Sequence, residues 1–322
     1  MKILQIGSGR WGSNHLRILR GLGVEVFVAE LAADERRRCL SEGLPADHVS
    51  ENFEDFLDRV DAVDIVTPAQ THLPIAISAM ARHKDIFCEK PLAENSAKAD
   101  EFAAAVKQAG VLCQVGHVFR YDPASAYMKN AIEAGELGAI RSLSGSFSGF
   151  KRPRDDGGVT ISDAIHFVDL FNYLLAATPD RVMAQCHDLL GRGLDDQAWL
   201  WLAYGETRAV IEANYFSPHK SRLVTVIGEK ATLVCNFAAA QDKITIFNNR
   251  HVREQGTWQG IAGEIMEKEI PPSEPLLLEL QDFIACVRGR RQPRAGAEAG
   301  AAAVRVIDAA LEASRRQQTV TL

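Results

Sequence analysis

The chain opens with the stretch MKILQIGSGRWG, residues 1–12, in which an apolar run is followed by three glycines: Gly7, Gly9 and Gly12. In a strand–turn–helix unit, the first glycine of this pattern permits a tight turn. The second lets the backbone approach a pyrophosphate, and the third lets the helix pack closely on the strand. The helix that follows presents unpaired N–H groups and the positive end of its dipole. The stretch therefore predicts a dinucleotide-binding turn, in which Arg10 and Trp11 belong to the same cofactor site.

Glu30 stands at the end of the second apolar run, Val24–Ala29. An acidic side chain about 20 residues after the glycines hydrogen-bonds the ribose hydroxyls of a dinucleotide and repels a 2′-phosphate. NAD is therefore the expected cofactor, and NADP is the less favoured alternative. The run Arg36–Arg38 lies further into the next helix and is expected to be a solvated face.

Short apolar runs alternate with amphipathic helical stretches through the first third of the chain. The runs are Ile3–Ile6, Val24–Ala29, Ala62–Val66, Ile86–Cys88 and Val111–Val115. Strands that alternate with helices predict βαβ units and a doubly wound parallel sheet. Residues 1–120 are therefore expected to form an NAD-binding Rossmann domain.

The chain changes character from about Ile140, where strand-like runs follow one another with short turns as far as Phe247. Two helical stretches, Leu276–Val287 and Glu298–Ser314, come last and are candidates to pack back on the first domain. Residues 121–322 are therefore expected to form an α+β domain with a large, open, mostly antiparallel sheet, connected as a meander. The predicted helices are too few to cover both faces of this sheet. Because an exposed apolar face needs a partner to cover it, we expect a homodimer or homotetramer.

The composition argues against several classes of function. The formal net charge of −6 lacks the basic excess of a nucleic-acid binder. No apolar stretch reaches the roughly 20 residues of a membrane span, and the N-terminus lacks the apolar core of a signal peptide, so we expect a cytoplasmic protein. The six cysteines form no C-x-x-C pair, and Cys186-His187-Asp188 has no second ligand pair, so we expect reduced thiols and no metal.

Polar motifs follow three of the expected parallel strands, at the points where those strands end. They are residues 67–72 (TPAQTH), 89–91 (EKP) and 116–117 (GH). Ligands of open α/β sheets bind outside the carboxyl ends of the strands. The expected site residues at this edge are, for the cofactor, Thr67, Pro68, His72, Glu89 and Lys90, and, for the substrate, His117.

Hydride transfer from an alcohol to a nicotinamide also requires removal of the hydroxyl proton, by a base with a cationic or hydrogen-bonding partner. Lys90 ends an apolar strand, where burial depresses the pKa of an amine. In residues 157–169 (GGVTISDAIHFVD), the stretch from Ser162 onward predicts a mainly apolar helix on which Asp163, His166 and Asp169 form a polar stripe. A core histidine held by Asp163 or Asp169 is the alternative interpretation. Beside a complete dinucleotide motif, we predict that Lys90, His166 and Asp163 are catalytic.

Cationic side chains gather near the expected substrate site: Arg120, Lys151, Arg152 and Arg154. In a protein of net charge −6 they predict an anionic substrate, because guanidinium pairs well with phosphate or carboxylate. The alternative is that Asp155 and Asp156, which follow at once, neutralise this loop themselves.

Taken together, these motifs resemble the Gfo/Idh/MocA family (glucose–fructose oxidoreductase, inositol dehydrogenase and rhizopine catabolism). The similarity rests on GSGRWG with the following Asn14-His15, VTPAQTH, EKP, GHVFRYDPA (116–124) and GGVTISDAIHFVDL (157–170), and it extends through LLLELQDFIACVRG near the C-terminus. The resemblance implies a Rossmann domain joined to an α/β domain whose open sheet faces a partner subunit. It also implies that Lys90 and His166 contact the reacting hydroxyl, one of them as acid or base. GHVFRYDPA is similar to members that act on nucleotide-linked sugars, such as UDP-N-acetylglucosaminuronate 3-dehydrogenases.

One spacing departs from the family. Its helix motif is commonly Asp-x-x-x-His, whereas this chain has Asp163-x-x-His166 with Ser162 at the usual aspartate position. Either Asp163 serves one step round the helix, or the site uses Ser162 on the substrate side.

The expected activity is an NAD-dependent dehydrogenase or reductase acting on a ring hydroxyl or ketone of a sugar, nucleotide sugar or cyclitol. One alternative is an NAD-dependent glycosidase that oxidises the sugar transiently. Another is a redox-silent NAD-binding regulator, a class that should lose the lysine or the histidine; this chain keeps both.

Overall fold

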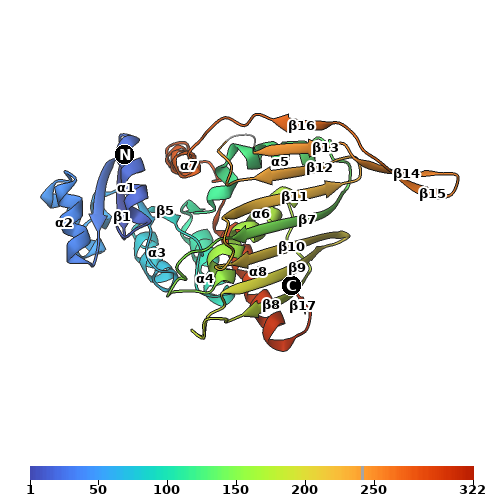
Figure 1. Ribbon diagram of the computed structural model, residues 1–322. Helices are drawn as coiled ribbons and strands as arrows, with labels where there is room; N and C mark the ends of the chain where they lie inside the picture. The colour runs from blue at the N-terminus through green and yellow to red at the C-terminus, as the bar shows by residue number, and fades with distance from the viewer. Residues whose placement is uncertain (241–242) are drawn as a thin grey trace. The chain divides into compact units, whose positions relative to one another are not determined.

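The apolar runs of the first third of the chain form a six-stranded parallel sheet with the strand order β3-β2-β1-β4-β5-β6 (Figure 1). Its strands are β1 (Lys2–Ile6), β2 (Glu25–Ala29), β3 (Val49–Ser50), β4 (Ala62–Ile65), β5 (Asp85–Cys88) and β6 (Cys113–Val115). The strand order runs outward in both directions from β1, which confirms the predicted doubly wound sheet.

This sheet belongs to the first of two compact units of the computed structural model, which describes residues 1–240 and 243–322. The first unit comprises Met1–Val118 and Glu274–Val304, and the second comprises Phe119–Ser273 and Arg305–Leu322. The helices of the first unit are α1 (Gly12–Gly21), α2 (Ala33–Ser41), α3 (His72–Met80), α4 (Ser96–Ala109) and α7 (Pro275–Gly289), with short turns η1 (Ala46–His48), η2 (Phe53–Asp55), η3 (Leu57–Arg59) and η4 (Ala69–Thr71).

The core of the first unit explains why these helices lie on the sheet. Helices α1 and α7 bury Leu16, Leu19 and Phe283 against the strand residues Ile3 and Phe87 in one apolar cluster. Helix α3 packs on α4 and contacts β4 and β5. Burial of this apolar surface on both faces is what a parallel sheet requires.

The second unit is built on a nine-stranded sheet with the order β16-β13-β12-β11-β7-β10-β9-β8-β17. Its strands are β7 (Ile140–Ser148), β8 (Arg181–His187), β9 (Gln197–Tyr204), β10 (Thr207–Asn214), β11 (Ser221–Gly228), β12 (Thr232–Asn236), β13 (Ile244–Phe247), β16 (Ile265–Lys268) and β17 (Val320–Thr321). Every pairing is antiparallel except that of β7 with β10. The expected large, mostly antiparallel sheet is confirmed.

Two details of this unit differ from the sequence prediction. The connection is not a simple meander, because β7 lies between β10 and β11. In addition, β14 (Arg250–Glu254) and β15 (Thr257–Ile261), a region with no predicted strands, form a separate hairpin that extends beyond the sheet (Figure 1).

Helices cover one face of the nine-stranded sheet. They include α5 (Pro123–Glu133) and α6 (Ile165–Leu175), which pack on each other and lie behind the sheet in Figure 1. The approach of α6 to β7 is close, since a Cβ on Gly145 would lie 2.6 Å from a ring carbon of Phe167. The remaining elements are η5 (Val118–Tyr121), a π-helical turn η6 (Thr160–Ala164) directly before α6, and α8 (Ala297–Arg316).

Candidate functional site

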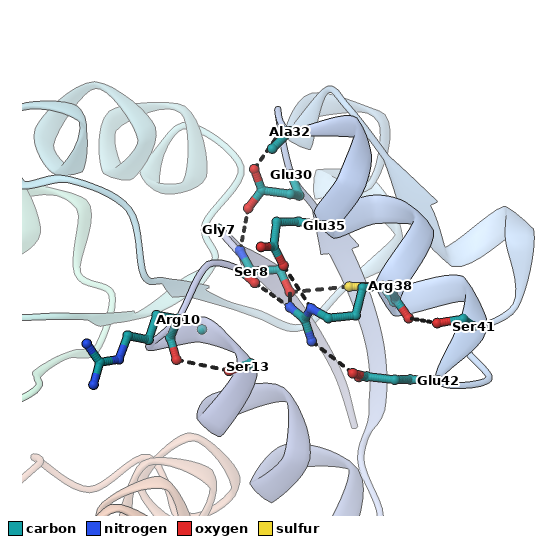
Figure 2. A network of polar contacts seen from close by, with 12 residues as sticks. Gly7, Ser8, Arg10, Ser13, Glu30, Ala32, Glu35, Arg38, Ser41 and Glu42 are labelled. Carbon is teal, nitrogen blue, oxygen red and sulfur yellow. Dashed lines mark hydrogen bonds and ion pairs between the residues drawn. The ribbon is translucent and has the colours of Figure 1, made fainter.

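The glycine turn joins β1 to α1 (Figure 2). Gly7 has a φ of +93°, and a Cβ there would lie 2.6 Å from the carbonyl oxygen of Val66, so only glycine fits. A Cβ on Gly12 would overlap the carbonyl oxygen of Gly7. By contrast, nothing lies within 4 Å of the Cβ position of Gly9. The turn therefore has room for a ligand at the position where the motif brings a pyrophosphate to the backbone.

Glu30 follows β2 and lies against this turn. Its carboxylate accepts hydrogen bonds from the backbone N–H groups of Ser8, at 2.6 Å, and Ala32, at 2.8 Å (Figure 2). Arg38 also contacts the turn, because its Nη2 donates to the carbonyl oxygen of Ser8 at 2.5 Å. The expectation of a solvated face was therefore wrong for Arg38, whose charge is paired with carboxylates of its own helix region, Glu35 and Glu42.

These residues fit a dinucleotide. The first turn of α1 carries no acidic side chain of its own, which suits the binding of a pyrophosphate at the positive end of the helix dipole. The carboxylate of Glu30 uses two of its roughly four acceptor positions on Ser8 and Ala32, which leaves the others for ribose hydroxyls. Arg10 and Trp11 follow the open Gly9 and are both exposed.

The polar motif after β4 is tied to the one after β5. The ring of His72 lies between two carbonyl oxygens, with Nε2 2.8 Å from that of Thr67 and Nδ1 3.1 Å from that of Pro91. Burial lowers the pKa of His72. Pro68 lies between Thr67 and η4, and the Lys90–Pro91 peptide bond is cis. His72 therefore fixes the segment that carries Lys90.

A buried charge cluster supports the same segment from α1. The ring of His15 lies between Asp64 and Glu89, with Nδ1 3.1 Å from a carboxylate oxygen of Asp64 and Nε2 3.3 Å from one of Glu89. Burial lowers the pKa of His15, but the charges and hydrogen bonds of both carboxylates outweigh that effect and raise it to about 10. Glu89 in turn accepts from the backbone N–H of Lys90 at 3.1 Å.

The second unit carries its polar residues around the π-helical turn and α6. Asp163, in the turn, is buried and pairs with Lys151, with Nζ and Oδ2 2.6 Å apart. The ring of His166 stacks on that of Phe147, with ring centres 5.3 Å apart and planes 14° apart. Because Nζ of Lys151 lies 5.8 Å from the centre of the Phe147 ring, these residues meet around one aromatic side chain.

Ser162 and His117 are both buried. The hydroxyl of Ser162 lies 3.4 Å from the carbonyl oxygen of Gly157, which precedes the π-helical turn. His117 directly follows Gly116, at which a Cβ would lie 2.6 Å from an oxygen of Glu89. His117 therefore belongs to the segment of the first unit that packs against Glu89.

The predicted substrate-binding arginines all have carboxylate partners. Arg120 is buried and makes a two-pronged ion pair with Asp169, at 2.8 and 2.6 Å. In the loop before the π-helical turn, Arg152 pairs with Asp155 and Arg154 with Asp156. These two ion pairs agree with the alternative given above, in which Asp155 and Asp156 neutralise the charge of the loop.

Two features of these sites have no counterpart in the sequence analysis. One is the contact of His15 with Asp64 and Glu89, three residues far apart along the chain. The other is Arg222, whose guanidinium carbon lies 3.4 Å from the centre of the Phe147 ring. A signal for Arg222 existed, because it stands two positions before Val224 in a strand whose alternate residues are buried.

Within residues 1–240 and 243–322, no group of three or more histidine, cysteine, aspartate or glutamate side chains is arranged to hold a metal ion. In the same residues, no helix combines the length and apolar character needed to cross a bilayer.

A doubly wound sheet with a dinucleotide turn and a second α/β unit with a histidine-bearing helix define an NAD-binding oxidoreductase. The comparison with known families agrees. Residues 1–117 match the NAD-binding Rossmann fold of the Gfo/Idh/MocA oxidoreductase family, and residues 129–322 match its C-terminal α/β domain. The chain belongs to this family, and it is an NAD(P)-dependent oxidoreductase that acts on CH–OH groups with NAD as cofactor.

Individual relatives cover nearly the whole chain. The scyllo-inositol 2-dehydrogenase (NAD(+)) of Bacillus subtilis strain 168 is 31% identical over 308 residues, which is 89% of this chain and 86% of that protein. The 4-carboxy-2-hydroxymuconate-6-semialdehyde dehydrogenase of a Sphingobium species is 29% identical over 91% of this chain and 92% of its own. The fold is also that of the WlbA dehydrogenase of Bordetella pertussis, solved with NADH and UDP-GlcNAcA, with a TM-score of 0.82, 20% identity and coverage of 100% and 98% of the two chains.

Proposed function

We propose that this enzyme transfers a hydride between NAD and a ring hydroxyl or ketone of a sugar, nucleotide sugar or cyclitol. Residues 1–120 bind the cofactor, and residues 121–322 bind the substrate. The observation that carries the proposal is the group formed in the second unit by Asp163, Lys151 and His166, whose contacts meet at the Phe147 ring. A paired carboxylate beside an imidazole suits the binding of a hydroxyl and the acceptance of its proton.

Lys90 and His166 have separate roles in this proposal. Bound NAD supplies the acceptor for the hydride. His166 accepts the proton of the reacting hydroxyl through a ring nitrogen, and the Lys90 ammonium donates a hydrogen bond to the same oxygen, which offsets its developing negative charge. Asp163 orients Lys151 and the substrate hydroxyls beside the ring of His166.

The remaining cofactor residues bind and orient. The N–H groups at the start of α1, with Arg10 and Trp11, receive the pyrophosphate, and Glu30 accepts from the ribose hydroxyls. Thr67, His72 and Glu89 hold the segments after β4 and β5 in place, through the bond between His72 and the Thr67 carbonyl and the bond from the Lys90 N–H to Glu89. Pro68 directly follows Thr67 in the same cofactor segment.

The relatives support the substrate class. The Bacillus protein acts on an inositol, which is a cyclitol, and the Sphingobium protein acts on a carboxylated semialdehyde. The inositol is a precedent for a ring hydroxyl as the reacting group, and the carboxylated semialdehyde is a precedent for an anionic substrate. We therefore retain both parts of the sequence prediction, a sugar-like ring and a negative charge on the substrate. His117, Arg120, Ser162 and the loop residues Lys151, Arg152 and Arg154 stay proposals for the substrate side.

A ligand panel tests the function. The enzyme, saturated with NAD, is screened by thermal shift with nucleotide sugars, sugar phosphates, free sugars and inositols, and binders are assayed for NADH formation. A ligand that binds only the folded state stabilises it by about 2.7 kcal/mol at 100 times its dissociation constant. Net NADH formed in step with substrate oxidation supports a dehydrogenase. Cleavage of a glycoside without net NADH would instead indicate the transient oxidation of a glycosidase.

We propose a homodimer or homotetramer because the uncovered face of the nine-stranded sheet is partly apolar. The strand register places Met183 of β8 opposite Trp201 of β9. Successive pairings across β10 and β7 show that Leu223 and Ile227 of β11 lie on the same face of the sheet. These four side chains are between 37% and 45% exposed. A second copy of the chain would cover them. A monomer by light scattering at micromolar concentration would contradict this proposal.

We also propose that the protein is cytoplasmic. The structure has six free thiols, which suit the reducing conditions of that compartment.

A further inference from the structure

Arg222 is a partly buried residue of the nine-stranded sheet. It lies on β11 directly opposite Phe147 of β7, so both side chains point to the same face. The next residues of that row, Val224 and Val226, are fully buried, whereas Leu223 and Ile227 of the alternate row are exposed. The Arg222 side chain therefore enters the face that α6 covers.

The guanidinium of Arg222 has no carboxylate partner among the residues that the structure describes. Its Nη1 donates to two backbone carbonyl oxygens, those of Ser148 at 2.8 Å and Ser221 at 2.5 Å. Its carbon lies 3.4 Å from the centre of the Phe147 ring. Within the described ranges, Nε and Nη2 have no acceptor.

This absence separates Arg222 from the other cations of the site. Lys151 is paired with Asp163, Arg120 with Asp169 and Arg154 with Asp156, so each of their charges is already offset. Burial lowers the pKa of Arg222, and the charge of Asp163 opposes this only in part. An unpaired charge in a partly buried position is unfavourable unless a ligand offsets it.

Arg222 shares an aromatic neighbour with His166, the proposed proton acceptor. The Phe147 ring that it contacts is also the ring on which His166 stacks, at 5.3 Å between ring centres. Two donor nitrogens in a planar fork match the two oxygens of a carboxylate or of a phosphate.

We propose that Arg222 binds an oxyanion of the substrate through Nε and Nη2 and so selects anionic substrates over neutral ones. The proposal rests on the function proposed above, and it names the residue that recognises the charge. Carboxylate and phosphate present the same paired oxygens, so either an acid sugar or a sugar phosphate supplies the ligand chemistry.

The test uses NADH-loaded enzyme and matched pairs of probes that differ in charge. D-glucuronate and D-glucose 6-phosphate are each compared with D-glucose, which separates the carboxylate from the phosphate source. L-tartrate is compared with L-threitol, a pair that makes few demands on ring stereochemistry. Dissociation constants are measured by calorimetry for the unmodified enzyme and for Arg222→Gln and Arg222→Lys.

Arg208→Gln is the matched control. Arg208 lies on β10 in the same sheet, and its Nη1 also donates to two backbone carbonyl oxygens, those of Gly205 and Thr207. Unlike Arg222, it is exposed. The control therefore separates the general effect of removing an arginine from this sheet from the specific effect of removing the charge beside Phe147.

We expect the unmodified enzyme to bind at least one anionic probe more tightly than its neutral match. Arg222→Gln should weaken that binding by about 10- to 100-fold, the range for a hydrogen bond to a charged group, while the neutral match and NADH bind as before. Arg222→Lys keeps the charge but loses the fork, so it should recover binding only in part. Arg208→Gln should change none of these constants.

Equal binding of each anion and its neutral match by the unmodified enzyme would overturn the proposal, as would an anion preference that survives in Arg222→Gln. If circular dichroism shows that Arg222→Gln does not fold, full anion binding by Arg222→Lys would refute the bidentate contact. NADH formation from an anionic substrate, with KM and kcat unchanged in Arg222→Gln, would exclude Arg222 from substrate binding but keep the proposed function. Anion binding that depends on Arg222, without any NADH formation, would support the role of Arg222 and contradict the proposed dehydrogenase function.

Discussion

A rise in pH from 6.5 to 8.5 is expected to destabilise the first unit through one buried histidine. His15 lies between Asp64 and Glu89, and its pKa in the folded protein is about 10, against 6.5 for the unfolded chain. A group whose pKa is raised on folding contributes its full stability below the unfolded pKa. That contribution is lost as the pH rises toward the folded pKa, because the unfolded chain gives up its proton first.

The size of the effect follows from the two pKa values. Between them, the free energy of unfolding falls by about 1.4 kcal/mol for each pH unit. Over the two units from pH 6.5 to 8.5, with the unfolded histidine half-protonated at the start, the expected loss is about 2 kcal/mol. Burial raises the pKa of the thiols of Cys88 and Cys113, so these groups add a loss of the same sign only above about pH 8.5.

The measurement has to resolve the first unit, since a chain of two units need not unfold in one step. Hydrogen exchange in a urea series, read on peptides from β1, β4 and β5 and corrected for intrinsic exchange rates, gives the opening free energy of that sheet. The matched variant is His15→Gln with Asp64→Asn, which removes the histidine and its nearer carboxylate together. This variant should be less stable at pH 6.5 and should lose most of the pH dependence.

Two results would refute the reasoning. An opening free energy that stays constant or rises between pH 6.5 and 8.5 would mean that His15 is not charged in the folded protein. A double variant with the same fall as the unmodified protein would assign the proton to another group.

Three further predictions concern cofactor binding and catalysis. Glu30→Ala should weaken NAD binding and narrow the preference over NADP, and comparable NADP binding by the unmodified enzyme would contradict the role of this carboxylate. Lys90→Ala and His166→Ala should each lower kcat by about 10²- to 10⁴-fold with little change in NAD affinity, and full activity would exclude the residue from the mechanism. Asp163→Asn should lower kcat by at least about 10-fold and Ser162→Ala should have little effect, whereas the opposite order would give the role to Ser162.

The fold of the first unit could be predicted because its signals are local. The spacing of Gly7, Gly9 and Gly12 after an apolar run specifies a strand, a turn and a helix within twelve residues, and the structure has β1 and α1 there. Glu30 directly follows the next strand, so its place beside the turn follows from the parallel pairing of β1 with β2.

The features that the sequence did not reveal depend on contacts between distant segments. The place of β7 between β10 and β11 is fixed by pairing across more than 60 residues, which no local pattern encodes. Likewise, His15, Asp64 and Glu89 come from three different segments, and each alone is an ordinary polar residue. The alternation of β11 already placed Arg222 in the same row as Val224, but its contact with Phe147 depends on the pairing of β11 with β7, which no local pattern encodes.

The π-helical turn at Thr160–Ala164 lies where this chain has Asp163-x-x-His166 in place of the family's Asp-x-x-x-His spacing. Sequence periodicity assumes an unbroken α-helix, in which residues three and four apart share a face, so Ser162 remained an alternative to Asp163 beside His166. A π-turn changes that register locally, and such turns are frequent at functional sites. Here the carboxylate of Asp163 meets Lys151 at 2.6 Å, whereas the Ser162 hydroxyl lies 3.4 Å from the carbonyl oxygen of Gly157, which precedes the turn. The contact with Lys151 is the physical reason for proposing Asp163 as the group that works with His166.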